Sequence, residues 1–92
     1  MNEKLSFIDF VDKLKLVKEC YGVRSGSYKN IICSADYIIG ERESTGNEFK
    51  INLKRLYDAY LNENHIDTFV LKNYVDRVQS PSYAILMEAG LC

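Results

Sequence analysis

The chain has 92 residues, which is the length of a single domain. Hydrophobic residues make up 47% of it and charged residues 27%, a balance that excludes an intrinsically disordered chain. Twelve Lys and Arg against thirteen Asp and Glu give a formal net charge of −1, which disfavours a dedicated nucleic-acid binder or a polybasic membrane-surface protein, since both use positive charge to meet phosphate. We therefore expect residues 1–92 to form one compact domain.

The first helix is predicted over residues 7–20. Ser6, followed three residues later by Asp9, is typical of a helix start. Apolar residues then recur at helical spacing: Phe7, Phe10, Val11, Leu14, Val17 and Tyr21. Gly22 follows as a C-cap and opens a Gly/Ser loop over residues 22–27.

The middle of the chain has a β-type pattern. Residues 30–33 predict a short strand, and residues 37–43 and 48–53 predict a hairpin. A three-residue loop, Ser44-Thr45-Gly46 with glycine in the left-handed region, fixes a register in which paired residue numbers sum to 90. Ile39 then faces Ile51 on the core side, Ile38 lies on the solvated side, and Arg42 lies opposite Glu48 as a cross-strand ion pair. A two-residue turn at Thr45-Gly46 is the alternative, and it would shift this register.

Three helices are predicted after the hairpin. Leu53, Leu56, Tyr57, Tyr60 and Leu61 form the apolar stripe of the first. Asp67 or Thr68 caps the second, whose apolar face extends to Val78. Ser80-Pro81 starts the third, which runs to Gly90. The predicted fold is α+β, with an N-terminal helix, a small antiparallel sheet of two or three strands, and three C-terminal helices packed on one face.

The last helix is unusual because Glu88 is its only charged residue. A helix that is apolar on all sides is either buried within the monomer or covered by a partner. The second alternative leads to our main hypothesis, a small protein-interaction or adaptor protein that self-associates as a homo-oligomer. The predicted interface residues are Tyr74, Tyr83, Ile85, Leu86 and Met87.

A second hypothesis is a protein associated with nucleic acid. The basic residues near the hairpin and the helix after it are the predicted contacts: Lys29, Arg42, Lys50, Lys54 and Arg55. Acidic residues, among them Glu41, Glu43 and Glu48, are interleaved with them and dilute the positive field. A helix-turn-helix role for the last two helices is disfavoured, since the second would present Tyr, Ile, Leu and Met to the bases.

A third hypothesis is a metal-dependent nuclease. Asp36 followed by Glu48-Phe49-Lys50 matches the D…ExK pattern, in which both carboxylates share one metal ion. The predicted register separates Asp36 from Glu48 by about 20 Å along the strand, so we expect the chain not to be an enzyme. Tyrosines lining a small-molecule pocket between sheet and helices are a further alternative.

The remaining candidates for chemistry are few. The three cysteines, Cys20, Cys33 and Cys92, form no CxxC pair, and His65 is the only histidine, so we expect no metal site and no cofactor. The start of the chain lacks the pattern of a signal peptide. The longest apolar run, at 83–87, is far shorter than the ~20 residues of a membrane span. We therefore expect a cytoplasmic protein with no membrane partner.

Overall fold

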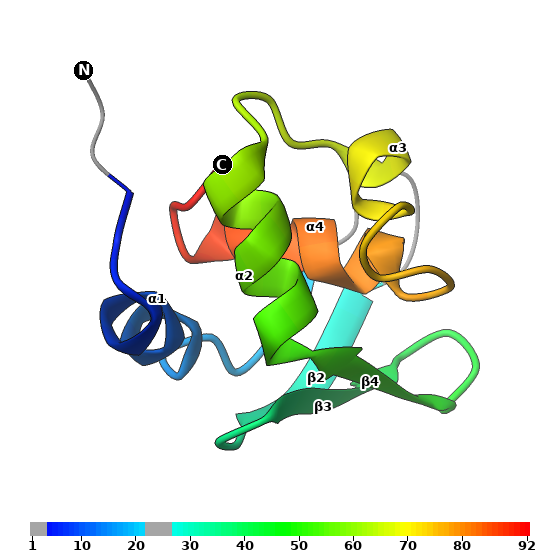
Figure 1. Ribbon diagram of the computed structural model, residues 1–92. Helices are drawn as coiled ribbons and strands as arrows, with labels where there is room; N and C mark the ends of the chain where they lie inside the picture. Colours follow the sequence, from blue (N-terminus) through cyan, green and yellow to red (C-terminus); the bar gives the residue numbers. More distant parts are fainter. Residues whose placement is uncertain (1–3, 22–26) are drawn as a thin grey trace.

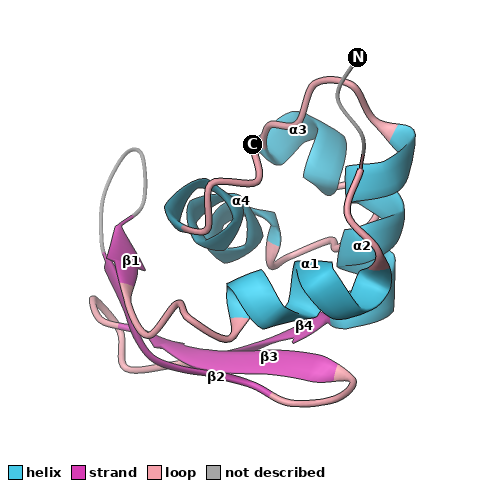
Figure 2. Ribbon diagram, turned by 90° about the vertical axis from the view of Figure 1, so that its left-hand side faces the viewer, coloured by secondary structure: helices cyan, strands magenta, loops and turns pink. Residues whose placement is uncertain are grey.

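The computed structural model describes residues 4–21 and 27–92 and has the predicted α+β architecture, with all of the described helices on one side of an antiparallel sheet (Figures 1 and 2). The elements follow in the order α1 (Phe7–Leu14), β1 (Cys20–Tyr21), β2 (Ser27–Cys33), β3 (Tyr37–Arg42), β4 (Glu48–Asn52), α2 (Leu53–Asn62), α3 (Thr68–Leu71) and α4 (Gln79–Glu88). The described sheet has four strands in the order β1-β2-β3-β4, where we predicted two or three. The predicted loop over residues 22–27 falls, apart from its last residue, outside the described residues.

Helix α1 starts where the sequence predicts and ends six residues early. The Ser6 hydroxyl accepts a hydrogen bond from the backbone N–H of Asp9 at 3.3 Å, which caps the first turn. After Leu14 the chain turns and becomes extended, and the carbonyl of Lys18 accepts a hydrogen bond from the N–H of Ile31 at 3.0 Å. Cys20 therefore belongs to an edge strand that pairs with β2, because pairing with the sheet outweighs continuation of the helix.

The hairpin register differs from the predicted one by one residue. Ile38 pairs with Ile51, Ile39 with Lys50, and Glu41 with Glu48, so paired numbers sum to 89. A four-residue loop over 43–46 replaces the predicted three-residue loop, and the hydrogen bond from the Arg42 N–H to the Asn47 carbonyl, at 2.8 Å, closes it. Gly46 does adopt the left-handed conformation that was predicted for it, with φ of 75°.

The shifted register exchanges the two faces of β3. Ile38 and Gly40 point into the core, whereas Ile39 points outward, the reverse of the prediction. Gly40 lies opposite Phe49, and a Cβ atom at Gly40 would stand 2.5 Å from Cζ of that ring. The buried Phe49 ring therefore needs a glycine across from it, and this contact stabilises the observed register. The predicted Arg42–Glu48 pair does not form, since Glu48 lies opposite Glu41.

The three C-terminal helices are present with altered lengths. Asn52 caps α2 by accepting the Arg55 N–H at 3.0 Å, and Asp67 caps α3 by accepting the Val70 N–H at 2.8 Å. Helix α3 is a single turn, and tight turns follow it up to Arg77, which has φ of 73°. Helix α4 starts at Gln79 without the predicted Ser80 cap and ends at Glu88, two residues before Gly90, which takes the left-handed conformation expected after a helix.

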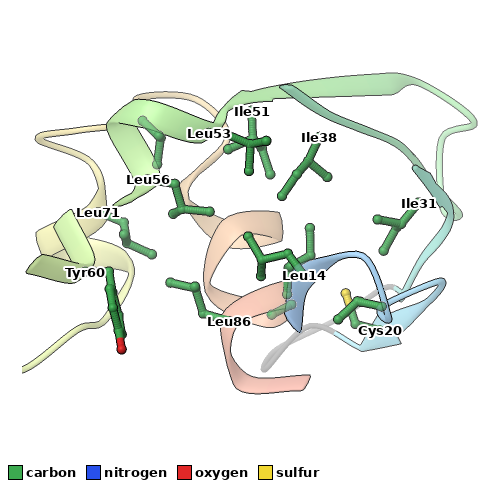
Figure 3. Close-up of a cluster of buried hydrophobic side chains, with 14 of the residues drawn as sticks. Leu14, Cys20, Ile31, Ile38, Ile51, Leu53, Leu56, Tyr60, Leu71 and Leu86 are labelled. Carbon is green, nitrogen blue, oxygen red and sulfur yellow. The ribbon is translucent and has the colours of Figure 1, made fainter. Parts of the chain in front are cut away.

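The core lies between the helices and the inner face of the sheet. Figure 3 shows buried side chains from α1, the sheet, α2, α3 and α4 gathered in one cluster, with Leu86 among them. Helix α4 packs against α3 and β1, and Ile85 and Leu86 are fully buried. Its apolar composition is thus satisfied within the monomer. Among the described residues, no helix is both long enough and apolar enough to cross a membrane.

Candidate functional site

A groove of about 560 Å³ opens where α1, the start of β3 and the first turns of α2 meet. Its volume lies in the range typical of small-molecule sites. Aromatic and charged side chains share its lining, which consists of Phe7, Ala35, Asp36, Tyr37, Asn52, Lys54, Tyr57 and Asp58.

The polar side of the groove is held by the junction between β4 and α2. Tyr37 pairs with Asn52 across the last rung of the hairpin. The Asp36 carbonyl accepts a hydrogen bond from the N–H of Leu53 at 3.0 Å, so the start of β3 is tied to the first residue of α2. Because the Asn52 side chain also caps α2, its amide oxygen is engaged while it lines the groove. Most of the lining therefore lies on regular elements, and Ala35 and Asp36 belong to the turn between β2 and β3.

The aromatic side of the groove is braced by contacts behind it. The Phe7 and Tyr57 rings meet edge to face with centroids 5.2 Å apart, and Phe10 lies 5.1 Å from Tyr57. The Tyr57 hydroxyl donates to the Leu5 carbonyl at 2.8 Å, and the Tyr60 hydroxyl accepts the Leu5 N–H at 3.0 Å. The first bond satisfies the hydroxyl of Tyr57, and the second ties the same residue, Leu5, to Tyr60.

Two carboxylates in the groove have no ion-pair partner among the described residues. Within the described part of the chain, ion pairs join Lys15 to Asp12 at 3.9 Å and His65 to Asp67 at 3.3 Å, and none involves Asp36 or Asp58. Lys54 lies one turn before Asp58 on α2, yet its ammonium is more than 4.0 Å from that carboxylate. The lining thus carries two negative charges and one positive charge.

Two of the four predicted interface residues on the C-terminal helix lie inside the monomer. Ile85 and Leu86 are fully buried, and Tyr83 is half-buried. Met87 is 49% exposed and is the member of this set that solvent reaches best. The Tyr74 hydroxyl donates to the Glu63 carboxylate at 2.8 Å, and this bond, more than burial, raises the pKa of Tyr74 above its usual value.

The basic residues predicted to contact nucleic acid are divided among different surfaces. Lys29 and Lys50 lie on the outer face of the sheet, and the Lys50 ammonium is 3.9 Å from the centroid of the Tyr37 ring. The Arg42 guanidinium donates to the Arg77 carbonyl at 3.1 Å and lies over Phe49, so folding already engages it. Lys54 lines the groove, and Arg55 is exposed on α2.

The residues of the D…ExK pattern remain apart in the observed register. Glu48 pairs with Glu41, five positions along the strand from Asp36, a separation of about 17 Å. No group of three His, Cys, Asp or Glu side chains able to hold a metal ion occurs in the described ranges. Burial, with a smaller contribution from the Glu88 carboxylate, raises the pKa of Cys20 to about 12, so this thiol is not a nucleophile at neutral pH.

The outer face of the sheet is a surface that the sequence prediction missed. Ile32 and Ile39 pair across β2 and β3 and are 64% and 38% exposed, and Tyr21 on β1 is 73% exposed. The sequence feature that indicates this exposed apolar surface is a pair of isoleucine doublets, Ile31-Ile32 and Ile38-Ile39. Adjacent strand residues point to opposite faces, so each doublet places one isoleucine on each side of the sheet.

Comparison of the chain with protein-family models, with curated proteins and with solved structures found no match.

Proposed function

We propose that the chain is a protein-interaction module that self-associates through the outer face of its sheet. The observation that carries this proposal is the exposed Ile32–Ile39 pair on a face that the described helices leave uncovered (Figure 2). A sheet whose strands are apolar on both faces is typical of a sheet covered on both sides. The helices cover the inner face, and a second copy of the chain would cover the outer one.

The charges on this face favour a protein partner over phosphate. Lys29 and Lys50 are matched by Glu41 and Glu48, so these four residues together carry no net charge. A nucleic-acid backbone or an anionic membrane needs an excess of Lys and Arg, which the paired residues Lys29, Glu41, Glu48 and Lys50 do not supply. Exposed isoleucine and tyrosine surrounded by charges of both signs are instead typical of a protein interface with an apolar centre and a polar rim.

The two ends of one row of charges are also complementary to each other, which favours a second copy as the partner. One row across the sheet runs Lys29, Glu41, Glu48, from a positive end on β2 to a negative end on β4. A two-fold axis parallel to the strands would place the lysine end of each row against the glutamate end of the other. Glu41, in the middle, already lies opposite Lys29 in its own sheet. Two-fold symmetry of this kind is the commonest arrangement in homo-oligomers.

The sequence hypothesis also has the chain self-associate, but through the C-terminal helix instead of the outer face of the sheet. Ile85 and Leu86 are buried in the chain's own core and would have to leave it before they could contact a partner. Ile32 is exposed in the folded monomer, so a partner could bury it without any rearrangement.

Sedimentation velocity over a concentration series tests the proposal. The wild-type chain should shift from monomer to dimer between about 1 µM and about 500 µM, the range of weak interfaces. Ile32→Glu should abolish this shift and leave the circular dichroism spectrum unchanged, since the side chain is already in solvent. Ile8→Glu, at a side chain on α1 that is 73% exposed, is the matched control and should dimerise like the wild type. A wild-type chain that stays monomeric throughout, or an Ile32→Glu variant that still dimerises, contradicts the proposal.

A further inference from the structure

The groove between α1, β3 and α2 has features that the proposed function does not use. Aromatic rings of Phe7, Tyr37 and Tyr57 lie in the same lining as the carboxylates of Asp36 and Asp58. Aromatic faces together with unpaired carboxylates are the chemistry by which proteins bind organic cations. We propose that this groove binds a small organic cation, an ammonium or amidinium group attached to a flat apolar body.

The carboxylates are available to such a ligand because no described residue forms an ion pair with them. Within the described ranges neither Asp36 nor Asp58 has an ion-pair partner, although Lys54 lines the same groove. Asp58 is half-buried, so its charge is less screened than that of a fully exposed carboxylate. A cation placed between Asp36 and Asp58 would offset the excess negative charge of the lining.

The chain itself shows that one ring of the groove attracts a cation. The Lys50 ammonium lies 3.9 Å from the centroid of Tyr37, within the range of a cation–π contact. Lys50 does not line the groove, but its positive charge at this ring repels an incoming cation. Removing its charge should make binding tighter, whereas removing the charge of Asp36 or Asp58 should make it weaker.

The apolar body of the ligand would lie against the Phe7–Tyr57 side. The hydrogen bond to the Leu5 carbonyl and the contact with Phe10 hold the Tyr57 ring in place, so little ordering of that ring is needed on binding. A volume of about 560 Å³ accommodates a one-ring or two-ring ligand. Benzylamine and benzamidine are therefore suitable probes, and benzoate is the anion of matched shape.

Titrations followed by amide chemical shifts test the proposal. Benzylamine or benzamidine should shift the amides of Tyr37, Lys54 and Asp58, with a dissociation constant on the order of millimolar, and benzoate should not. Asp36→Asn with Asp58→Asn should weaken binding about tenfold. Glu48→Gln, which removes one carboxylate outside the groove, should leave binding within about twofold of wild type. The shift pattern of the folded state confirms that each variant keeps its fold.

Two further arms make the result specific to the groove. Lys50→Gln should tighten binding a few-fold, whereas Lys29→Gln, which removes a charge from the same sheet face without touching Tyr37, should not. A blocked Gly-Arg-Gly peptide that binds at the same amides more tightly than benzamidine would identify the natural source of the cation as a protein side chain. The proposal is overturned if neither cation shifts these amides, if benzoate shifts them equally, or if Glu48→Gln weakens binding as much as the groove variants do.

Discussion

Replacing Gly40 by alanine tests the observed register of the sheet. The added Cβ would stand 2.5 Å from Cζ and 2.9 Å from Cε2 of Phe49, and 3.1 Å from Cγ1 of Ile31. The ring would have to move by roughly 1 Å to reach an ordinary contact distance. It is buried and meets the Tyr28 ring edge to face at 5.6 Å, so it has little room to move. We expect Gly40→Ala to destabilise the fold by about 1–3 kcal/mol.

Phe49→Leu provides the background that removes this clash. Leucine lacks the Cζ and Cε2 atoms that the new methyl group would meet, so Gly40→Ala should be near neutral there. Its remaining effect should be a gain of at most about 1 kcal/mol, because alanine loses less backbone entropy than glycine on folding. Urea unfolding of the wild type, the two single variants and the double variant gives the coupling energy between these positions.

The predicted coupling between Gly40 and Phe49 is about 1–3 kcal/mol, favourable in the double variant. In the register derived from the sequence, Gly40 lies opposite Lys50 and points to solvent. Strictly additive effects of the two substitutions would therefore refute the observed pairing. A Gly40→Ala variant as stable as the wild type would refute it equally.

Three other perturbations give distinct results. Leu86→Asp should unfold the chain, because an isolated carboxylate would enter the core, whereas Met87→Asp next to it should change the free energy of unfolding by less than about 0.5 kcal/mol. Circular dichroism with thermal melting measures both effects. A folded Leu86→Asp chain would contradict the central placement of α4. Asn52→Ala should cost about 1 kcal/mol through loss of the α2 cap, while Asn52→Asp should retain most of the stability; equal stability of all three in urea would show that the cap contributes nothing. Burial raises the pKa of Cys20 from 9.0 to about 12, so between these pH values the native state keeps a proton that the unfolded state releases. The free energy of unfolding should therefore fall by about 1.4 kcal/mol per pH unit in that window. Urea unfolding from pH 8 to about 11 should show a shallower decline for Cys20→Ala, and an unchanged slope would refute the assignment.

Helix boundaries were predictable where a local cap decides them. Ser6 and Asp67 act as caps through hydrogen bonds to residues three positions on, which short-range spacing identifies. The end of α1 was not predictable from spacing, because Val17 and Cys20 are buried whether the segment is helical or extended. What decides the matter is the pairing of residues 18–21 with β2, which is a contact distant in sequence.

In the hairpin, one additional loop residue shifts the strand register and so reverses which side chains of β3 face the core. The sequence identified both strands and the left-handed glycine, but loops of three and four residues are both compatible with the residues at the turn. The contact between Gly40 and Phe49 distinguishes them, and it depends on tertiary packing. The outward position of Ile39 follows from this contact, so the surface proposed for self-association could not be derived before the register was known.

The role of the last helix was left open by the sequence for a physical reason. An apolar helix has the same sequence pattern whether its own chain or a partner chain covers it. Burial of Ile85 and Leu86 depends on how α3 and β1 pack against α4, which composition does not specify. The groove was equally inaccessible to spacing arguments, because Phe7, Asp36 and Asp58 are brought together only by the fold.

Isotope-filtered nuclear Overhauser spectroscopy on a mixture of labelled and unlabelled chains tests the central claim most directly. At concentrations where the chain dimerises, the methyl groups of Ile32 and Ile39 should give contacts between the two copies. Contacts between copies that arise from Met87 and Tyr83 instead, with none from the isoleucines of the outer sheet face, would contradict the account.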